Sequence, residues 1–118
     1  MSYVLLIHQG DAPLPQSEEW EQLPDEEKKA VYQDYQAIRE TPGVSPGLQL
    51  QPAETATTVR VHNGQTLTTD GPISGNGNGL AGYLVFEADE FDDAIDLASR
   101  IPQARLGGAV EVRRVTTS

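Results

Sequence analysis

The chain has 118 residues, a formal net charge of −10 and no cysteine. This length suits one compact domain, so we expect a single domain over residues 1–118. The charge disfavours nucleic acid and anionic membrane as partners, because the field of the protein repels polyanions. Without cysteine there is no disulfide, thiolate nucleophile or cysteine metal site.

The sequence shows neither a membrane span nor a secretory signal. Its longest early apolar run, Val4 to Ile7, is far shorter than the roughly 18 apolar residues of a span. No basic segment followed by a long apolar segment opens the chain. We therefore expect a cytoplasmic protein, in agreement with the lack of cysteine.

The N-terminal part of the chain predicts a strand followed by a helix. Residues 3–7 (YVLLI) form a short apolar run that is typical of a buried strand. Pro24 and the three acids after it mark a helix start, because proline suits the first helical position and acids suit the positive end of the helix dipole. Val31, Tyr35 and Ile38 then recur at helical spacing, which predicts one apolar face.

The middle of the chain predicts a β-hairpin. Residues 47–50 suit a short strand, and residues 57–62 alternate between apolar and polar side chains. Asn63-Gly64 is the strongest hairpin signal, because both positions tolerate the positive φ of a type I′ turn. Residues 65–69 form the return strand, which ends at Asp70-Gly71-Pro72 because proline cannot donate to the ladder.

The C-terminal part predicts a strand, a helix and a last strand. Residues 80–87 are strand-like, and residues 109–115 (AVEVRRV) alternate as a final strand. Between them Asp89 suits the N-cap of a helix, with Asp92 three residues later as in a capping box. The expected apolar stripe of this helix consists of Phe91, Ala94, Ile95 and Ala98.

The order of these elements predicts a ferredoxin-like α+β fold. A strand, a helix, several strands, a helix and a strand fit an antiparallel sheet with both helices on one face. The other face of the sheet would then stay open and partly apolar. We therefore expect a homodimer that covers it.

A glycine-rich stretch precedes the strand at residue 80. Gly77 to Gly82 (GNGLAG) has the spacing of a dinucleotide-binding motif, but that motif must open into a helix, whereas strand-like residues follow here. No phosphate-binding lysine motif occurs either, so we expect no cofactor. The glycines instead predict a mobile loop.

The same stretch carries a resemblance to a known family. "TTDGPISGNGNGLAGYLVFEAD" resembles the D-G-P-F motif and following strand of the YCII-related proteins. The resemblance extends to "YVLLIHQGD", "GLQLQPAETATTVRVHNGQTLTTDGP" and "ASRIPQARLGGAVEVRRV", and so covers nearly the whole chain. It implies a small bacterial, cytosolic, dimeric domain of ferredoxin-like, dimeric α+β barrel type. Most such proteins have no established activity, although some relatives are linked to dehalogenase-type or lyase-type chemistry through a histidine–aspartate pair.

The sequence departs from the family pattern at several positions. Ile73 replaces the phenylalanine of the motif, and the loop at 74–78 is uncharged. Ile101 stands where the enzyme-like relatives have the aspartate, and Leu106 stands where they often have a histidine. These changes weaken any catalytic role inherited from the family.

His8 and Asp70 are the candidate catalytic residues. His8 ends the first strand, and a histidine acts as a general base near neutral pH when a carboxylate orients it. Asp70 would place a carboxylate at the mouth of a cleft between sheet and helices. The structural alternatives are a strand-end histidine bonded to backbone or water, and an aspartate that bonds its own turn.

Arg60, Arg105 and Glu111 are the candidate ligand-binding residues. The two guanidinium groups suit a planar anion such as a carboxylate or phenolate. The alternative is cross-strand ion pairing on the polar face of the sheet. We expect no metal site, because two histidines and a solvated acidic helix face offer few ligands.

Two hypotheses of different classes follow. The first is a small-molecule-binding domain that performs cofactor-free acid–base chemistry, namely elimination, isomerisation or a lyase-type reaction. The second is a non-catalytic dimeric interaction or regulatory domain.

Overall fold

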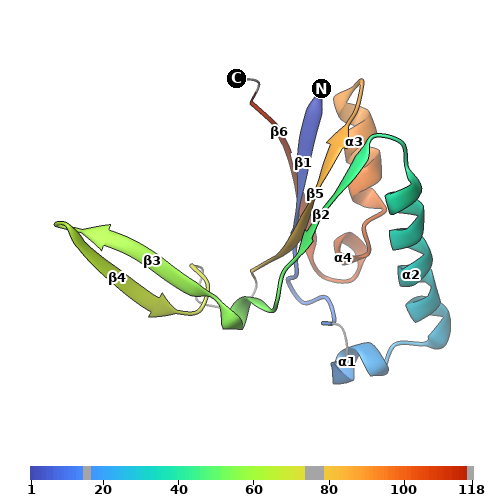
Figure 1. Cartoon of the computed structure of the whole chain (residues 1–118). Coiled ribbons are helices and arrows are strands. Elements are labelled where there is room, and N and C mark those ends of the chain that lie inside the picture. Colours follow the sequence, from blue (N-terminus) through green and yellow to red (C-terminus); the bar gives the residue numbers. More distant parts are fainter. Residues whose placement is uncertain (15–16, 74–78, 117–118) are drawn as a thin grey trace.

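The computed structural model describes residues 1–14, 17–73 and 79–116. Strands and short and long helices follow one another along the chain (Figure 1). The elements are β1 (Ser2–His8), α1 (Glu18–Glu21), α2 (Asp25–Glu40), β2 (Val44–Gln49), a 3₁₀ turn η1 (Ala53–Thr55), β3 (Thr57–His62), β4 (Gln65–Asp70), β5 (Leu80–Glu87), α3 (Phe91–Ser99), α4 (Pro102–Arg105) and β6 (Ala109–Arg114).

Four of the strands form one antiparallel sheet in the order β2-β5-β1-β6. Figure 1 shows α2, α3 and α4 on one side of this sheet. Each long helix connects two strands that are separated by one other strand, which is the ferredoxin-like arrangement. The predicted α+β fold is therefore confirmed.

The core lies between the sheet and the helices. Alternate residues of β1 point into it, so Tyr3, Leu5 and Ile7 are buried while their neighbours are half-buried. From the helices, Ile38 and Leu97 close the core, and both are almost completely buried. The sheet is thus covered on one face, and its other face carries the second set of alternate side chains.

Several local predictions needed correction. The second strand begins at Val44, earlier than expected, and two short helices, α1 and α4, occur in segments for which no helix was predicted. The N-cap of α3 is Glu90, not Asp89, and no side chain caps it. Leu97 takes the core position of this helix, whereas Phe91 and Ile95 are largely exposed.

The predicted hairpin is present, but it forms a sheet of its own. β3 and β4 pair with each other around Asn63 and Gly64, whose φ angles of 49° and 76° give the expected tight turn. Figure 1 shows this hairpin extending away from the sheet on the side opposite the helices. We call residues 57–70 the arm.

β5 begins at Leu80, so a strand follows the glycine-rich stretch, as its residues predicted. A dinucleotide-binding motif would need a helix there. The predicted mobile loop at 74–78 lies outside the described residues. Among the helices that are described, none is both long and apolar enough to cross a membrane.

Candidate functional site

His8 lies at the end of β1 on the sheet face that the helices leave open. It belongs to the set of β1 residues that alternates with the buried Leu5 and Ile7, so it faces away from the helices. Its neighbours across the sheet are Leu80 on β5 and Ala109 on β6. The pairing of β1 with β5 shifts register between Ile7 and His8, and Ala81 on β5 is the residue that the shift passes over.

Glu111 supplies a carboxylate next to this histidine. Glu111 lies opposite Leu6 on the adjacent strand, so its side chain shares the open face with His8. His8 Nε2 is 3.4 Å from Glu111 Oε1. Both side chains are partly exposed, at 39% and 53%, which leaves the imidazole accessible to a ligand.

A groove of about 680 Å³ opens beside His8. Its walls come from the segment before the arm, the segment after the arm and the start of β5. Most of the lining is apolar, and His8 is the titratable residue among the described residues that form it. The lining residues are His8, Leu50, Gln51, Pro52, Ala53, Thr55, Ala56, Pro72, Ile73, Gly79 and Leu80.

The two segments at the base of the arm are tied together by hydrogen bonds. The amide of Gly71 donates to the carbonyl of Ala56 at 2.7 Å, and the hydroxyl of Thr58 donates to the carbonyl of Gly71 at 2.8 Å. Thr58 is the one buried residue of β3. These bonds fix the base of the arm, and with it one wall of the groove.

Close packing fixes the opposite wall. The amide of Gln9, directly after His8, donates to the carbonyl of Gly79 at 3.1 Å. A Cβ atom on Gly79 would lie 2.5 Å from the Cβ of Ala53, which is closer than real side chains approach. Glycine at position 79 therefore lets the two walls meet.

Asp70 and Arg60 both belong to the arm and do not line this groove. Asp70 ends β4 opposite Thr57, and Arg60 lies on β3 opposite Leu67. Both are exposed. The structure thus places His8 next to Glu111, and it does not bring Asp70 or Arg60 of the same chain into the lining. Their catalytic and ligand-binding roles stay predictions.

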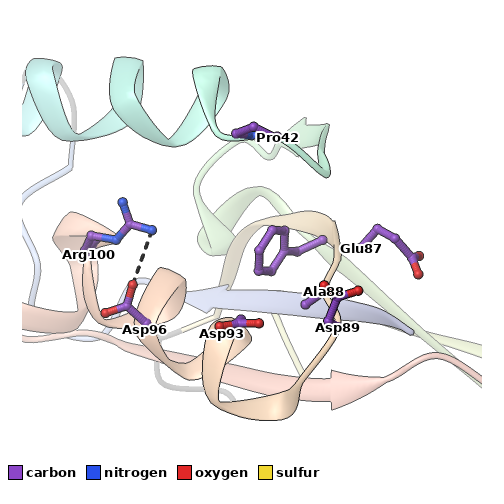
Figure 2. Close-up of a pocket in the computed structure, with 8 residues that line it drawn as sticks. Pro42, Glu87, Ala88, Asp89, Asp93, Asp96 and Arg100 are labelled. Carbon is purple, nitrogen blue, oxygen red and sulfur yellow. Dashed lines mark ion pairs between the residues drawn. The ribbon is translucent and has the colours of Figure 1, made fainter.

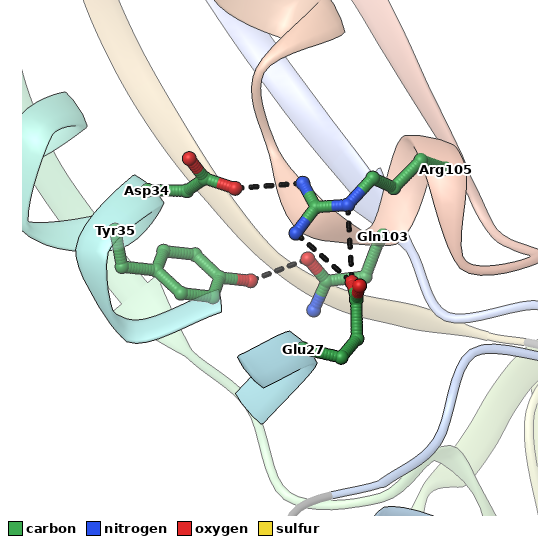
Figure 3. A network of polar contacts seen from close by, with 5 residues as sticks. All are labelled: Glu27, Asp34, Tyr35, Gln103 and Arg105. Carbon is green, nitrogen blue, oxygen red and sulfur yellow. Dashed lines mark hydrogen bonds and ion pairs between the residues drawn. The ribbon is translucent and has the colours of Figure 1, made fainter. Parts of the chain in front are cut away.

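Arg105 lies on the helical side of the protein, in a polar network between α2 and α4 (Figure 3). Its Nη1 donates to Asp34 Oδ2 at 2.7 Å, and its Nη2 and Nε donate to Glu27 Oε1 at 3.2 and 3.3 Å. Desolvation alone lowers the pKa of Arg105, but the hydrogen bonds and charges of Asp34 and Glu27 outweigh it and raise the pKa above its ordinary value. A ligand anion at Arg105 would have to compete with two carboxylates, so its ligand-binding role also stays a prediction.

Beside Arg105, the hydroxyl of Tyr35 donates to Gln103 Oε1 (Figure 3). Burial raises the pKa of the Tyr35 phenol, and the hydrogen bond to Gln103 offsets part of that rise. The network joins the long helix α2 to the segment that leads into β6, the strand that carries Glu111.

A second, smaller cleft of about 310 Å³ lies between the end of β5 and α3 (Figure 2). Its acids are Glu87, Asp89, Asp93 and Asp96, and Arg100 pairs with Asp96 at 3.5 Å. Among the described residues, no three histidine, aspartate or glutamate side chains are arranged to hold a metal ion. We interpret this cleft as a solvated acidic surface.

The comparison with known families agrees with this architecture. The model of the YCII-related domain matches residues 1–117. The chain belongs to the YCII-related domain family. A relative of this YCII-related domain in Rhizobium meliloti (strain 1021), named only as an uncharacterized protein, is 30% identical over 93 residues, and the match covers 75% of each chain.

Family membership accounts for the fold of this YCII-related domain, whereas an activity has to be argued from the side chains of a site. The pairing of His8 with Glu111 was missed at the level of sequence, although both residues were candidates. The alternation in "AVEVRR" indicates that the side chain of Glu111 points away from the core. Only the register between β1 and β6 shows that it lies beside His8.

Proposed function

We propose that this YCII-related domain binds a small aromatic, anionic molecule in the groove beside His8 and performs cofactor-free acid–base chemistry on it. The observation that carries the proposal is the placement of the His8–Glu111 pair at the rim of a mostly apolar groove. Apolar walls suit an aromatic ring, and a few polar groups at one end orient the ligand. His8 is the polar group at that end.

The chemistry assigned to His8 is proton transfer. A neutral imidazole takes a proton from carbon next to a carbonyl or from a hydroxyl, and becomes an imidazolium. The carboxylate of Glu111, 3.4 Å away, then faces that positive charge and stabilises it. The imidazolium returns the proton at another atom of the ligand, which yields an isomerisation, or it remains protonated while a leaving group departs, which yields an elimination.

The alternative function is a non-catalytic interaction domain. The arm favours it, because Val59 and Val61 on β3 are 59% and 69% exposed and, within the described residues, β3 pairs only with β4. Exposed apolar side chains on an extended hairpin are typical of a surface that meets another protein. The two functions are compatible, since an interaction surface can border a binding groove.

Phenylpyruvate is a suitable probe of the acid–base proposal, because it is an aromatic anion with an acidic benzylic carbon next to a carbonyl. We expect the protein to accelerate hydrogen–deuterium exchange at that carbon, followed by NMR in D₂O. His8→Ala should lower the acceleration by about 10²-fold or more, the usual contribution of a general base. Glu111→Gln should lower it less.

The chain offers a matched control, since His62 is its second histidine and lies at the tip of the arm. His62→Ala should leave the exchange rate unchanged. The proposed function would be contradicted if the exchange were no faster with the protein than in buffer, or if His8→Ala and His62→Ala lowered the acceleration equally.

A further inference from the structure

Asn63, at the tip of the arm, stands in a sequence context in which an asparagine side chain reacts with its own main chain. Gly64 follows it, and a glycine without a Cβ atom lets its main-chain nitrogen approach the preceding side chain closely. Both residues are exposed. Apart from its chain neighbours, a Cβ atom built on Gly64 would meet no atom within 4 Å, so the surroundings do not hinder that approach.

The main-chain nitrogen of Gly64 would be the nucleophile of this reaction. Among the main-chain hydrogen bonds that the described residues make in turns and loops, none is donated by this amide. The ladder of the arm ends at the pair of His62 and Gln65, which the two turn residues connect. The described structure therefore does not hold this nitrogen in a main-chain hydrogen bond.

The folded turn slows the reaction, because its conformation is not the reactive one. Asn63 and Gly64 have φ angles of 49° and 76°, as a type I′ turn requires. For ring closure the Gly64 nitrogen must swing toward the side-chain carbonyl carbon of Asn63, by rotation about the bond between the Cα and the main-chain carbonyl carbon of Asn63. This rotation breaks the turn, so the reaction proceeds from an arm whose tip has opened.

Little in the described structure opposes that opening. β3 and β4 pair only with each other within the described residues. Eleven of the twelve strand residues are exposed, and Thr58 is the exception. An isolated two-stranded hairpin is marginally stable in water, and a segment with few buried contacts opens at a small cost in free energy. The tip should therefore open often while the rest of the protein stays folded.

We propose that Asn63 is a site of spontaneous main-chain modification, at which the tip of the arm converts to aspartate and isoaspartate as the protein ages. The Gly64 nitrogen forms a bond to Asn63 Cγ and gives up its proton, and the side-chain nitrogen leaves as ammonia. Water then opens the five-membered ring at one of its two carbonyl carbons. Opening at Cγ yields aspartate, whereas opening at the main-chain carbonyl carbon yields isoaspartate, in which the peptide bond to Gly64 is made by Cγ.

The two products affect the arm differently. Aspartate keeps the hairpin, because Asp-Gly suits a type I′ turn as Asn-Gly does. Isoaspartate adds a carbon atom to the main chain of a two-residue loop, so the pairing of His62 with Gln65 loses its register. Isoaspartate thus loosens the arm from its tip, whereas the hydrogen bond of Thr58 to Gly71 still ties its base.

Mass spectrometry of the aged full-length protein tests the site directly. The protein is incubated at neutral pH, folded or unfolded in guanidinium chloride, and the gain of one mass unit is localised by fragmentation, since Asn76 and Asn78 also precede glycines. We expect Asn63 to convert in the folded protein within about 10-fold of its rate in the unfolded chain, because a marginally stable hairpin offers little more protection. Conversion that is slower than this limit would overturn the inference.

Gln65 provides an internal control in the same samples, because it is a second exposed side-chain amide at the same tip. It would have to form a larger, six-membered ring, and Thr66 after it carries a branched side chain that crowds the approach. We therefore expect Gln65 to stay intact while Asn63 converts. Equal conversion of the two would point to general hydrolysis of exposed amides and would overturn the inference.

Amide hydrogen exchange tests the effect of the modification on the arm. The isoaspartate form, purified by ion exchange, is compared with Asn63→Asp, which has the same charge and an unaltered main chain. We expect the amides of β3 and β4 to exchange about 10-fold faster or more in the isoaspartate form, since the hairpin has lost its turn. Exchange in β1 should stay equally slow in both. Equal exchange of the arm in the two proteins would overturn the claim that isoaspartate loosens it.

These outcomes are independent of the proposed function. Neither Asn63 nor Gly64 lines the groove beside His8, so the acid–base proposal stands or falls on other measurements. His8→Ala should leave the conversion of Asn63 unchanged.

Discussion

His8 shows how much of a site depends on one neighbour. Both histidines of the chain end a strand, and neither lies in a sequence motif that sets it apart. His8 differs from His62 because an adjacent strand brings Glu111 to 3.4 Å and because an apolar groove begins beside it. The proposed chemistry therefore depends on the pair and the groove together.

Gly79 is a position at which a larger side chain should change the shape of the groove. Gly79→Ala would bring a Cβ to 2.5 Å from that of Ala53, so one wall must move. We expect the free energy of unfolding to fall by about 1–3 kcal/mol, as for other overpacked sites. Thermal or urea denaturation measures it.

The double variant Ala53→Gly, Gly79→Ala provides the control, because it removes the methyl group that the new side chain at position 79 would meet. We expect it to be more stable than Gly79→Ala alone. If the changes in the free energy of unfolding caused by the two substitutions simply add, crowding against Ala53 is not the reason for glycine at this position.

At the scale of elements, the joint between α2 and α4 carries a pH dependence. Burial raises the pKa of Tyr35 in the folded protein above the value of about 10 that an unfolded chain shows. Above pH 10 the unfolded chain loses this proton first, so the unfolded state binds fewer protons than the native one. The free energy of unfolding should therefore fall as pH rises from about 10 through the pKa of the folded state, with a slope of up to about 1.4 kcal/mol per pH unit.

In Tyr35→Phe the free energy of unfolding should fall less steeply as the pH rises in this alkaline range. The substitution also removes the hydrogen bond to Gln103 and therefore lowers stability at neutral pH. Tyr32→Phe is the matched control on the same helix, since Tyr32 is 65% exposed. Denaturant titrations between pH 9 and 11 measure both slopes. Equal slopes in the wild type and Tyr35→Phe would show that Tyr35 is not the group responsible.

The sequence correctly predicted the elements that depend on local signals. Its predictions were wrong or incomplete where the packing of distant segments determines the structure. Asn63-Gly64 indicated the hairpin correctly, because its turn geometry is local. The stripe of α3 was wrong at Ile95, since the short helix turns Leu97 toward the sheet instead. The neighbour of His8 was also beyond local signals, because strand register is set by the whole sheet. The fold could therefore be predicted from the sequence. For the site, individual candidate residues could be predicted, but not which of them lie together.

At the scale of the whole molecule, two surfaces of the described chain are left without a partner: the open face of the sheet and the arm. The groove is lined by His8 at the end of β1 and by the segments that flank the arm, so a partner on either surface would change access to it. The acidic cleft beside α3 (Figure 2) shares no lining residue with this groove.

A titration of the ¹⁵N- and ¹³C-labelled protein with benzoate, followed by NMR, locates the binding site of an aromatic anion directly. We expect the largest shift changes at the imidazole of His8, the methyl of Ala53 and the methyls of Leu80, which line one groove. Saturable changes that centre on Asp93 and Asp96 instead, or no saturable change at His8, would contradict the account.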